Sequence, residues 1–214
     1  MKIHLLVLGA MTLALAGCGN PENPEPPPRV SREGGYLRVV NLTDAALQVK
    51  IGHQLNPTTI HPGNGTVFAR FRAGKQPVTL GVATSPTRFD VECVADRYRS
   101  VVLHGSASKP QHAMVVQKRA LSEAGPTLEI HRVAGATGSV ELVQAGARTP
   151  LEGASPSLSA GSGRIVVRLA SGKEAVLEAD FAADGIYSLF IGPARAALLR
   201  DNETMQAVGE AGSR

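Results

Sequence analysis

The sequence predicts an all-β protein made of two tandem small Greek-key-type β-sandwich domains, which follow a leader and a proline-rich tether. Three observations support this class. From Tyr36 onward, short apolar–polar alternations are separated by Gly, Pro, Asn and Asp, as is typical of strands and turns. The only helical contenders, 120–125 and 194–199, are short. The pattern also occurs twice, at nearly constant spacing.

The chain opens with a predicted signal peptide over residues 1–17. Lys2 supplies a positive charge, and an apolar run follows from Ile3 to Leu15. This run is too short to span a bilayer, which needs roughly 20 apolar residues. The signal is expected to end at the small residues before Cys18.

Leu15-Ala16-Gly17-Cys18 resembles the lipobox of bacterial lipoproteins. This resemblance implies cleavage between Gly17 and Cys18 and acylation of Cys18 with fatty acids such as palmitate. Because each buried methylene contributes about 0.8 kcal/mol, several acyl chains anchor a protein stably to a bilayer. The absence of aspartate at position 19 implies, by the family's sorting rule, the outer membrane with the protein facing the periplasm.

Residues 18–35 are predicted to be the lipidated cysteine and its tether. Five prolines occur between Pro21 and Pro28, and proline lacks the N–H that helices and sheets need. An extended spacer is expected, of about 3.1 Å per residue. Its place between an anchor and a domain favours a spacer over a ligand for an aromatic groove.

The first β-sandwich domain is predicted over 36–120 and the second over 125–203, with a disordered tail over 204–214. The strands expected in the first domain are 36–41, 46–51, 66–71, 78–84, 88–94, 98–104 and 113–118. Those expected in the second domain are 127–133, 139–144, 164–169, 175–181, 187–191 and 194–200. Long loops are expected over His53–Gly65 and Ala145–Gly163, which are rich in turn residues.

Matching sequence features indicate that the second domain is a copy of the first. The offset between the copies runs from 87 (Ala73 to Ala160) to 89 (Tyr98 to Tyr187). Leu37-Arg38-Val39-Val40 and Leu128-Glu129-Ile130-His131 begin the two series. Each copy holds roughly 90 residues, which is enough for a small sandwich.

Composition limits the classes of function. The net charge is only +4, Trp is absent and the basic residues are scattered, so a nucleic-acid-binding surface is not expected. If Cys18 is acylated, Cys93 has no partner. It alternates with Phe89 and Val91, so a small buried thiol is expected, with a reactive thiol as the alternative.

No catalytic or metal site emerges from the pattern, and no cofactor is expected. Ser106-Ala107-Ser108-Lys109 matches S-x-x-K but lies in a predicted turn without companion motifs. Among the histidines, which include the loop pair His53 and His61, the best metal pair is His104 with His112, since a hairpin could set them opposite each other. Asp90 and Glu92 are expected to face solvent.

The chain resembles the bacterial envelope domain family 4397, a domain of unknown function that often occurs in tandem. The resemblance lies in Tyr36 to Gly52, in Asp96 to Gly105 and, at the start of the second copy, in Thr127 to Gly146. The layout is also similar to the alginate-biosynthesis F protein, a periplasmic tandem β-sandwich accessory factor in polysaccharide acetylation. The resemblance covers roughly 36–200 and carries no catalytic motif. It implies an accessory role in envelope polysaccharide modification or export.

The expected function is therefore a non-catalytic binding, scaffold or accessory module of the cell envelope, not an enzyme, with a protein or polysaccharide partner. The two long loops are the expected contact regions, since loops on rigid scaffolds carry function. Their Gly, Pro and Asn content equally fits simple connectors. Two alternatives stay open. One is a serine-dependent hydrolase or acyltransferase on envelope esters, and the other is a periplasmic metal or ligand carrier.

Overall fold

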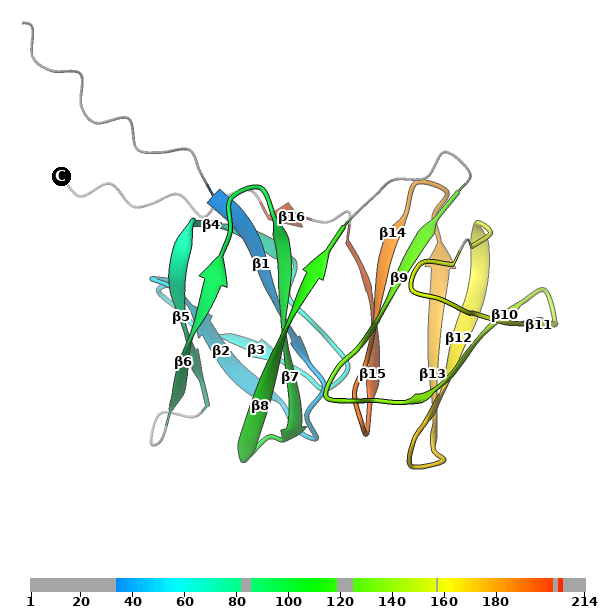
Figure 1. Cartoon of the computed structure of the whole chain (residues 1–214), viewed down its shortest axis with the longest axis horizontal. Helices are drawn as coiled ribbons and strands as arrows, with labels where there is room; N and C mark the ends of the chain where they lie inside the picture. Colours follow the sequence, from blue (N-terminus) through cyan, green and yellow to red (C-terminus); the bar gives the residue numbers. More distant parts are fainter. Residues whose placement is uncertain (1–33, 82–85, 119–124, 157, 202–203, 206–214) are drawn as a thin grey trace, which may run out of the picture. The chain divides into compact units, whose positions relative to one another are not determined.

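A computed structural model describes residues 34–81, 86–118, 125–156, 158–201 and 204–205. These residues form β-strands and no helix (Figure 1). No helix long and apolar enough to cross a membrane therefore occurs in this part of the chain. All of the described residues belong to one compact unit. The all-β class predicted from the sequence is confirmed.

The first half of the chain forms a sandwich of two sheets. Its strands are β1 (Gly34–Asn41), β2 (Leu47–Ile51), β3 (Thr58–Ile60), β4 (Phe68–Arg72), β5 (Gly74–Leu80), β6 (Thr87–Cys93), β7 (Tyr98–Ser106) and β8 (Lys109–Gln117). We call the sheet β3-β2-β5-β6 outer sheet 1 and the sheet β16-β4-β1-β7-β8 inner sheet 1. Non-consecutive neighbours such as β1–β7 and β2–β5 show that the chain crosses between the sheets, as in Greek-key-type sandwiches.

Apolar alternation explains the core of this sandwich. In β2, Leu47, Val49 and Ile51 are buried, whereas Gln48 is exposed and Lys50 is half-buried. These three side chains join aliphatic residues of β1, β5, β6 and β7 in one buried cluster. Fully burying such a side chain contributes about 1.5–3 kcal/mol, so an aliphatic core holds the sheets together without tryptophan.

The second half repeats this arrangement. Its strands are β9 (Thr127–Arg132), β10 (Gly138–Gln144), β11 (Ala147–Pro150), β12 (Gly161–Leu169), β13 (Glu174–Phe181), β14 (Ile186–Ile191) and β15 (Ala196–Arg200). We call β15-β14-β9 inner sheet 2 and β11-β10-β12-β13 outer sheet 2. A separate aliphatic cluster fills the space between them.

Strand order and register show that the two halves are copies. β1 pairs in parallel with β7, and β9 pairs in the same way with β14. The order β3-β2-β5-β6 likewise corresponds to β11-β10-β12-β13. Gly74 and Gly161 open β5 and β12 with similar positive φ angles of 115° and 118°, which favour glycine at both positions.

The register corrects one of the predicted matches. Leu37 pairs with Arg99 and Leu128 pairs with Tyr187, so Tyr187 corresponds to Arg99 and not to Tyr98. The two tyrosines therefore lie on opposite faces of their sheets. Tyr98 stacks on Tyr36, whereas Tyr187 is buried in the second core. A one-residue shift reverses the face because side chains alternate along a strand.

Three short strands were not predicted. β3 and β11 lie inside the two expected loops, and β16 (Thr204–Met205) lies where the disordered tail was expected to begin. β11 is exposed throughout and β3 has one buried residue, so neither carries the alternation that marks a strand. β3 and β11 pair with β2 and β10, and β16 pairs with the backbone of β4. The tail beyond 205 lies outside the described residues, and the predicted domain boundaries stay a prediction.

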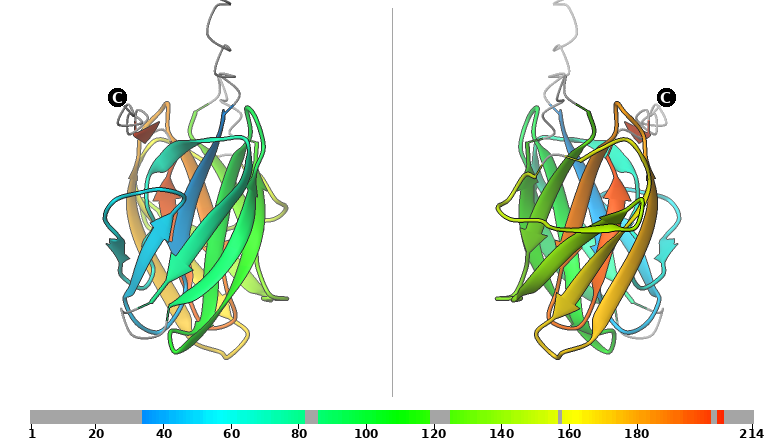
Figure 2. Two further views of the ribbon diagram at one scale, coloured as in Figure 1. Left: turned by 90° about the vertical axis from the view of Figure 1, so that its left-hand side faces the viewer. Right: turned by 90° about the vertical axis from the view of Figure 1, so that its right-hand side faces the viewer.

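The two inner sheets face each other (Figures 1 and 2). They pack through a cluster of apolar side chains. The register places these side chains at equivalent positions of the two copies. The matched pairs are Leu42 with Val133, Val102 with Phe190, Ala113 with Ala197, and Val115 with Leu199. The halves therefore meet through the same face of each copy, as in a two-fold symmetric dimer.

A buried ring of polar side chains joins the inner sheets. Arg38 Nη1 lies 2.5 Å from Asp201 Oδ1, and Arg38 Nε donates to Ser100 Oγ at 2.8 Å. Ser100 Oγ donates to Gln117 Oε1, and Gln117 Nε2 donates to Ser188 Oγ and Asp201 Oδ2. Ser188 Oγ also donates to Asp201 Oδ2, which closes the ring. All five residues are buried, so the ring fixes the two copies in one register.

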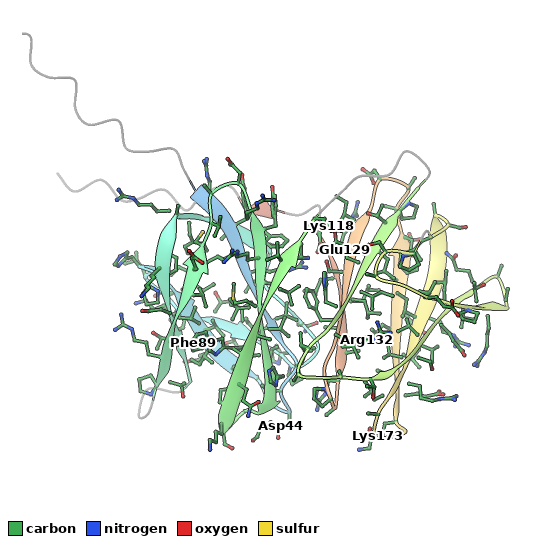
Figure 3. The ribbon with its side chains drawn as sticks, viewed as in Figure 1. Asp44, Phe89, Lys118, Glu129, Arg132 and Lys173 are labelled. Atoms are coloured by element: carbon green, nitrogen blue, oxygen red, sulfur yellow. The ribbon has the colours of Figure 1, made fainter. Side chains whose placement is uncertain are left out.

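The ring is itself pseudo-symmetric. By register, Ser100 corresponds to Ser188, Gln117 to Asp201 and Arg38 to Glu129. Glu129 makes the contact that mirrors the Arg38–Asp201 pair, since its carboxylate accepts the backbone N–H of Lys118 at 3.1 Å, next to Gln117 (Figure 3). Equivalent positions thus carry opposite charges in the two copies.

Candidate binding cleft in the first sandwich

A cleft of about 400 Å³ opens at the edge of the first sandwich, between β3 and β4. Three core side chains, Leu37, Val49 and Ile51, form its floor. Its remaining lining is Gln54, Thr58, Thr59, Ile60, His61, Asn64, Gly65, Thr66, Val67 and Ala69. An apolar floor with a polar rim is the common form of a ligand site.

The segment after β3 stays on one side of the cleft because it is bonded to β1. Gly63 N–H donates to Asn41 O, and Thr66 N–H donates to Val39 O. Gly65 permits this close approach, since a Cβ there would lie 3.0 Å from Val39 O of β1. The segment therefore lies along the inner sheet. The floor residues Leu37, Val49 and Ile51 are only 1%, 2% and 4% exposed.

Asn41 holds the β3 side of the cleft. Its Nδ2 donates to the backbone carbonyls of Ala45 and Ile60, and its Oδ1 accepts from the N–H and hydroxyl of Thr43. Asn41 and Thr43 are both fully buried. A buried, satisfied network of this kind fixes the end of β3 and gives the cleft a defined wall.

The chain from β2 to β5 carries basic side chains and no acidic ones. No Asp or Glu occurs from 45 to 89, which covers β2 to β5 and all but four residues of β6. The same stretch carries five cationic side chains, Lys50, Arg70, Arg72, Lys75 and Arg88, of which all but the half-buried Lys50 are exposed. This acid-free stretch was visible in the sequence, but none of its five cationic side chains lines the cleft.

A second, shallower groove lies on outer sheet 2. Its volume is about 660 Å³, and its charged lining comes from Arg164, Glu178 and Asp180. Ser162 Oγ lies 3.4 Å from Asp180 Oδ1 at this surface. The groove is open and polar, so it offers little apolar area for a ligand to bury.

The histidine pair suggested as a metal site is not brought together. Leu103 pairs with His112 and His104 pairs with Gln111, so the two imidazoles lie on opposite faces of inner sheet 1. His112 stacks on Phe89 with ring centroids 3.9 Å apart, and His104 is buried. Burial lowers the pKa of His104, and the charge of His112 lowers it further. Among the described residues, no group of three or more His, Cys, Asp or Glu side chains is placed to hold a metal.

Ser106 lies exposed at the β7–β8 hairpin, and its hydroxyl is 2.8 Å from that of Ser108. Ser106 pairs with Lys109 across the β7–β8 ladder. Within the described part of the chain, however, the Ser106 hydroxyl forms hydrogen bonds with Ser108 and with no histidine or lysine side chain. The arrangement that a serine nucleophile needs is therefore absent at Ser106 in this structure.

Cys93 is a buried free thiol, as expected from its alternation with Val91. Burial raises its pKa, which opposes formation of the reactive thiolate. Asp90 and Glu92 are exposed, also as expected, and Glu92 lies 3.5 Å from Arg99. Gly17 and Cys18, the predicted cleavage and acylation residues, lie outside the described residues.

Comparison with known proteins adds little to this geometry. No family model matches the chain, and no curated protein matches it. It is similar to the N-terminal domain of AlgF from P. aeruginosa at 20% identity over 40% of this chain and 94% of that one, with a TM-score of 0.31. It is also similar to a candidate cell adhesion protein from Bacteroides uniformis at 11% identity over 78% of this chain and 98% of that one, with a TM-score of 0.21. Both TM-scores are low, so neither similarity indicates a function for this chain.

Proposed function

We propose that this protein is a lipid-anchored lipoprotein of the bacterial cell envelope and acts as a non-catalytic binding or accessory module. Cleavage between Gly17 and Cys18 and acylation of Cys18 attach it to the outer membrane. The tether over 18–35 then holds the paired sandwiches in the periplasm. A protein or a polysaccharide of the envelope is the partner.

The single observation that carries this proposal is the open cleft between β3 and β4. It lies over aliphatic side chains of the core, on a scaffold whose two halves are joined by a buried polar ring. A preformed cleft held on rigid strands lowers the entropic cost of binding for a partner. The cleft lies beside the loop predicted as a contact region.

The process that this module serves is proposed from the sequence resemblance, as envelope polysaccharide modification or export. The polar groove on outer sheet 2 has hydrogen-bonding side chains of the kind that sugars need. The cleft, by contrast, lies over apolar side chains of the core.

Site-specific photo-crosslinking in living cells tests the proposal. A photoreactive amino acid replaces Thr59, which is exposed and lines the cleft. The matched control places it at Val176, which is 52% exposed on outer sheet 2. We expect a reproducible adduct from position 59 and none of the same mass from position 176. The absence of any adduct specific to position 59 would contradict a binding role for the cleft.

A further inference from the structure

We propose that the end of the first sandwich at which the tether arrives is a docking face for the anionic phospholipids of the membrane surface. This inference rests on the lipid anchor proposed above, because the anchor brings the membrane within reach of this end. We call the four exposed cations there, Arg72, Lys75, Arg97 and Lys118, the tether-end cations. They are separate from the cleft and from the buried polar ring.

The tether-end cations lie around the start of β1. Gly34, the first described residue, pairs with Arg72 at the end of β4. β5 and β7 also begin at this end of the sandwich, and β6 and β8 end there (Figure 1). Lys75 is the second residue of β5, Arg97 immediately precedes β7, and Lys118 immediately follows β8. The strand register therefore brings together cations from three separate parts of the chain.

Positive charge is concentrated in the first copy. Residues 34–118 include ten Lys or Arg and four Asp or Glu, which gives a net charge of +6. Residues 125–201 include seven Lys or Arg and eight Asp or Glu, which gives a net charge of −1. The copy that the tether joins is therefore the cationic one.

Within the first copy, the tether end holds most of this charge. Arg70 and Arg99 also lie at this end, and Glu92 and Asp96 are its acids, so its net charge is +4. The opposite end of the same strands has a net charge of only +1, from Arg88, Lys109 and Asp44. The first sandwich is therefore polarised along its strands, with the positive end at the tether.

The tether-end cations are available to a partner. All four are exposed, and none of them forms an ion pair within the described part of the chain. Glu92, one of the two acids at this end, lies 3.5 Å from Arg99 and offsets the charge of that guanidinium. The other acid, Asp96, is exposed in the turn between β6 and β7. An excess of exposed positive charge therefore remains at this end.

The second copy shows that the fold does not need these cations. By register, Lys75 corresponds to Ser162 and Arg97 to Gly185. The acid of the same turn is kept as Asp184, whose carboxylate lies 3.5 Å from Arg200. Two of the cations are thus replaced by uncharged residues in the copy that the tether does not join. Folding therefore does not explain them, whereas a contact specific to the tethered copy does.

A bilayer is the surface that the tether keeps near this end. Cys18 and Gly34 are 16 positions apart, so an extended tether spans about 50 Å at most. Each Lys or Arg strengthens attraction to an anionic bilayer about fivefold, within a Debye length of about 10 Å. Guanidinium and ammonium groups also donate to phosphate oxygens. An acidic polysaccharide would match the same charges, but it would not explain why they lie at the tether.

The test measures how close each end of the first sandwich comes to the lipid headgroups. The acylated protein is placed in nanodiscs of phosphatidylcholine, with or without phosphatidylglycerol, whose headgroups include a nitroxide quencher. A fluorescent amino acid replaces Ala73, between β4 and β5 at the tether end. The matched label replaces Ser108 in the β7–β8 hairpin, roughly 25 Å away along the nine-residue strand β7.

Two triple variants separate the tether-end cations from net charge. The charge variant is Arg72→Gln/Lys75→Gln/Arg97→Gln. Its matched control removes the same number of exposed cations elsewhere, as Arg88→Gln/Lys109→Gln/Lys173→Gln. Circular dichroism confirms that each variant is folded.

We expect the label at position 73 to be quenched about twofold more strongly when phosphatidylglycerol is present, and the label at 108 to be quenched equally in both discs. The charge variant should lose this difference and the control should keep it. Salt at about 0.5 M should also abolish it, because the Debye length then falls below about 5 Å.

Three results would overturn the inference. Equal quenching at position 73 in both discs, or an undiminished difference in the charge variant, would do so and leave the anchor intact. A response of this label to soluble polygalacturonate without a response to phosphatidylglycerol would make an acidic polysaccharide the partner instead. A protein that carries no acyl chain and enters neither disc would overturn the proposed lipoprotein function, and the inference with it.

Discussion

Replacing Asp201 by Asn tests whether the buried ring holds the two copies together. Asp201 is fully buried, and its carboxylate contacts Arg38 Nη1 at 2.5 Å, Ser188 Oγ at 2.5 Å and Gln117 Nε2 at 3.0 Å. Asparagine keeps the shape of the side chain and removes the negative charge that faces the guanidinium. Arg38 is only 1% exposed, so solvent cannot supply the lost interaction.

The expected loss is about 3–5 kcal/mol in the free energy of unfolding, since removing one partner of a buried ion pair leaves a buried charge uncompensated. This is a large fraction of the roughly 5–15 kcal/mol that stabilises a typical domain. Removing both charges in Arg38→Met/Asp201→Leu should recover most of the loss, because an apolar pair of similar volume is often neutral or stabilising. The neutral control Ser188→Ala, which loses hydrogen bonds but no charge, should cost about 1–3 kcal/mol.

Urea unfolding followed by circular dichroism measures these free energies, and an unchanged slope with urea would show that the same surface unfolds in each variant. If Asp201→Asn lowers the free energy of unfolding by less than about 1 kcal/mol, the Arg38–Asp201 ion pair is not the main stabilising contact of the ring. A double variant no more stable than Asp201→Asn would show that the cost lies in packing and not in the unpaired charge.

Four further predictions follow from single residues. Cys93 should react with a thiol reagent at least about a hundredfold more slowly in the folded protein than in urea, because burial raises its pKa and shields it. The pKa of His104 in the folded protein lies below its unfolded value of about 6.5, so the unfolded state binds more protons near that pH. The free energy of unfolding should therefore fall as the pH drops from about 7 through this range. In urea titrations, the His104→Gln variant should lose less of its free energy of unfolding over the same pH change. Leu158→Ala should cost about 2–5 kcal/mol on urea unfolding, whereas Leu55→Ala should stay within about 0.5 kcal/mol. Cys18→Ala should abolish labelling by clickable palmitate and release the protein from the membrane fraction; retained label would exclude Cys18 as the acylated residue.

The alternation of apolar and polar residues in the sequence was sufficient to predict the strands that form the two cores. Leu47, Val49 and Ile51 mark β2, because they are buried and alternate with the polar Gln48 and Lys50. In β12, Ile165 and Val167 are buried and the flanking Arg164 and Arg168 are exposed, but Val166 between them is buried as well. β3 and β11 have no such alternation, since their pairing with a neighbouring strand and not their own side chains makes them strands. No single-strand pattern predicts an edge strand of this kind.

The buried polar ring could not be predicted from the sequence, for a different reason. Arg38 and Gln117 occupy the outward face of an inner sheet, where a polar residue in a lone sandwich would simply be solvated. Only the second copy, which covers that face, turns them into buried groups. The sequence did carry one usable signal, the charge reversal between Arg38 and Glu129 at equivalent positions of the repeat. The cleft has no corresponding signal in the sequence, because it is a space between side chains and not a pattern of residues.

The charge reversal also explains why the two copies pair with each other. In the structure Arg38 faces Asp201, and the mirrored contact sets Glu129 beside Gln117 and Lys118. Pairing two first copies through the same faces would set each buried Arg38 against a neutral Gln117. Pairing two second copies would set Glu129 against Asp201 and bury two like charges. Both self-pairings leave buried charges uncompensated, so the charges favour the mixed pair within one chain.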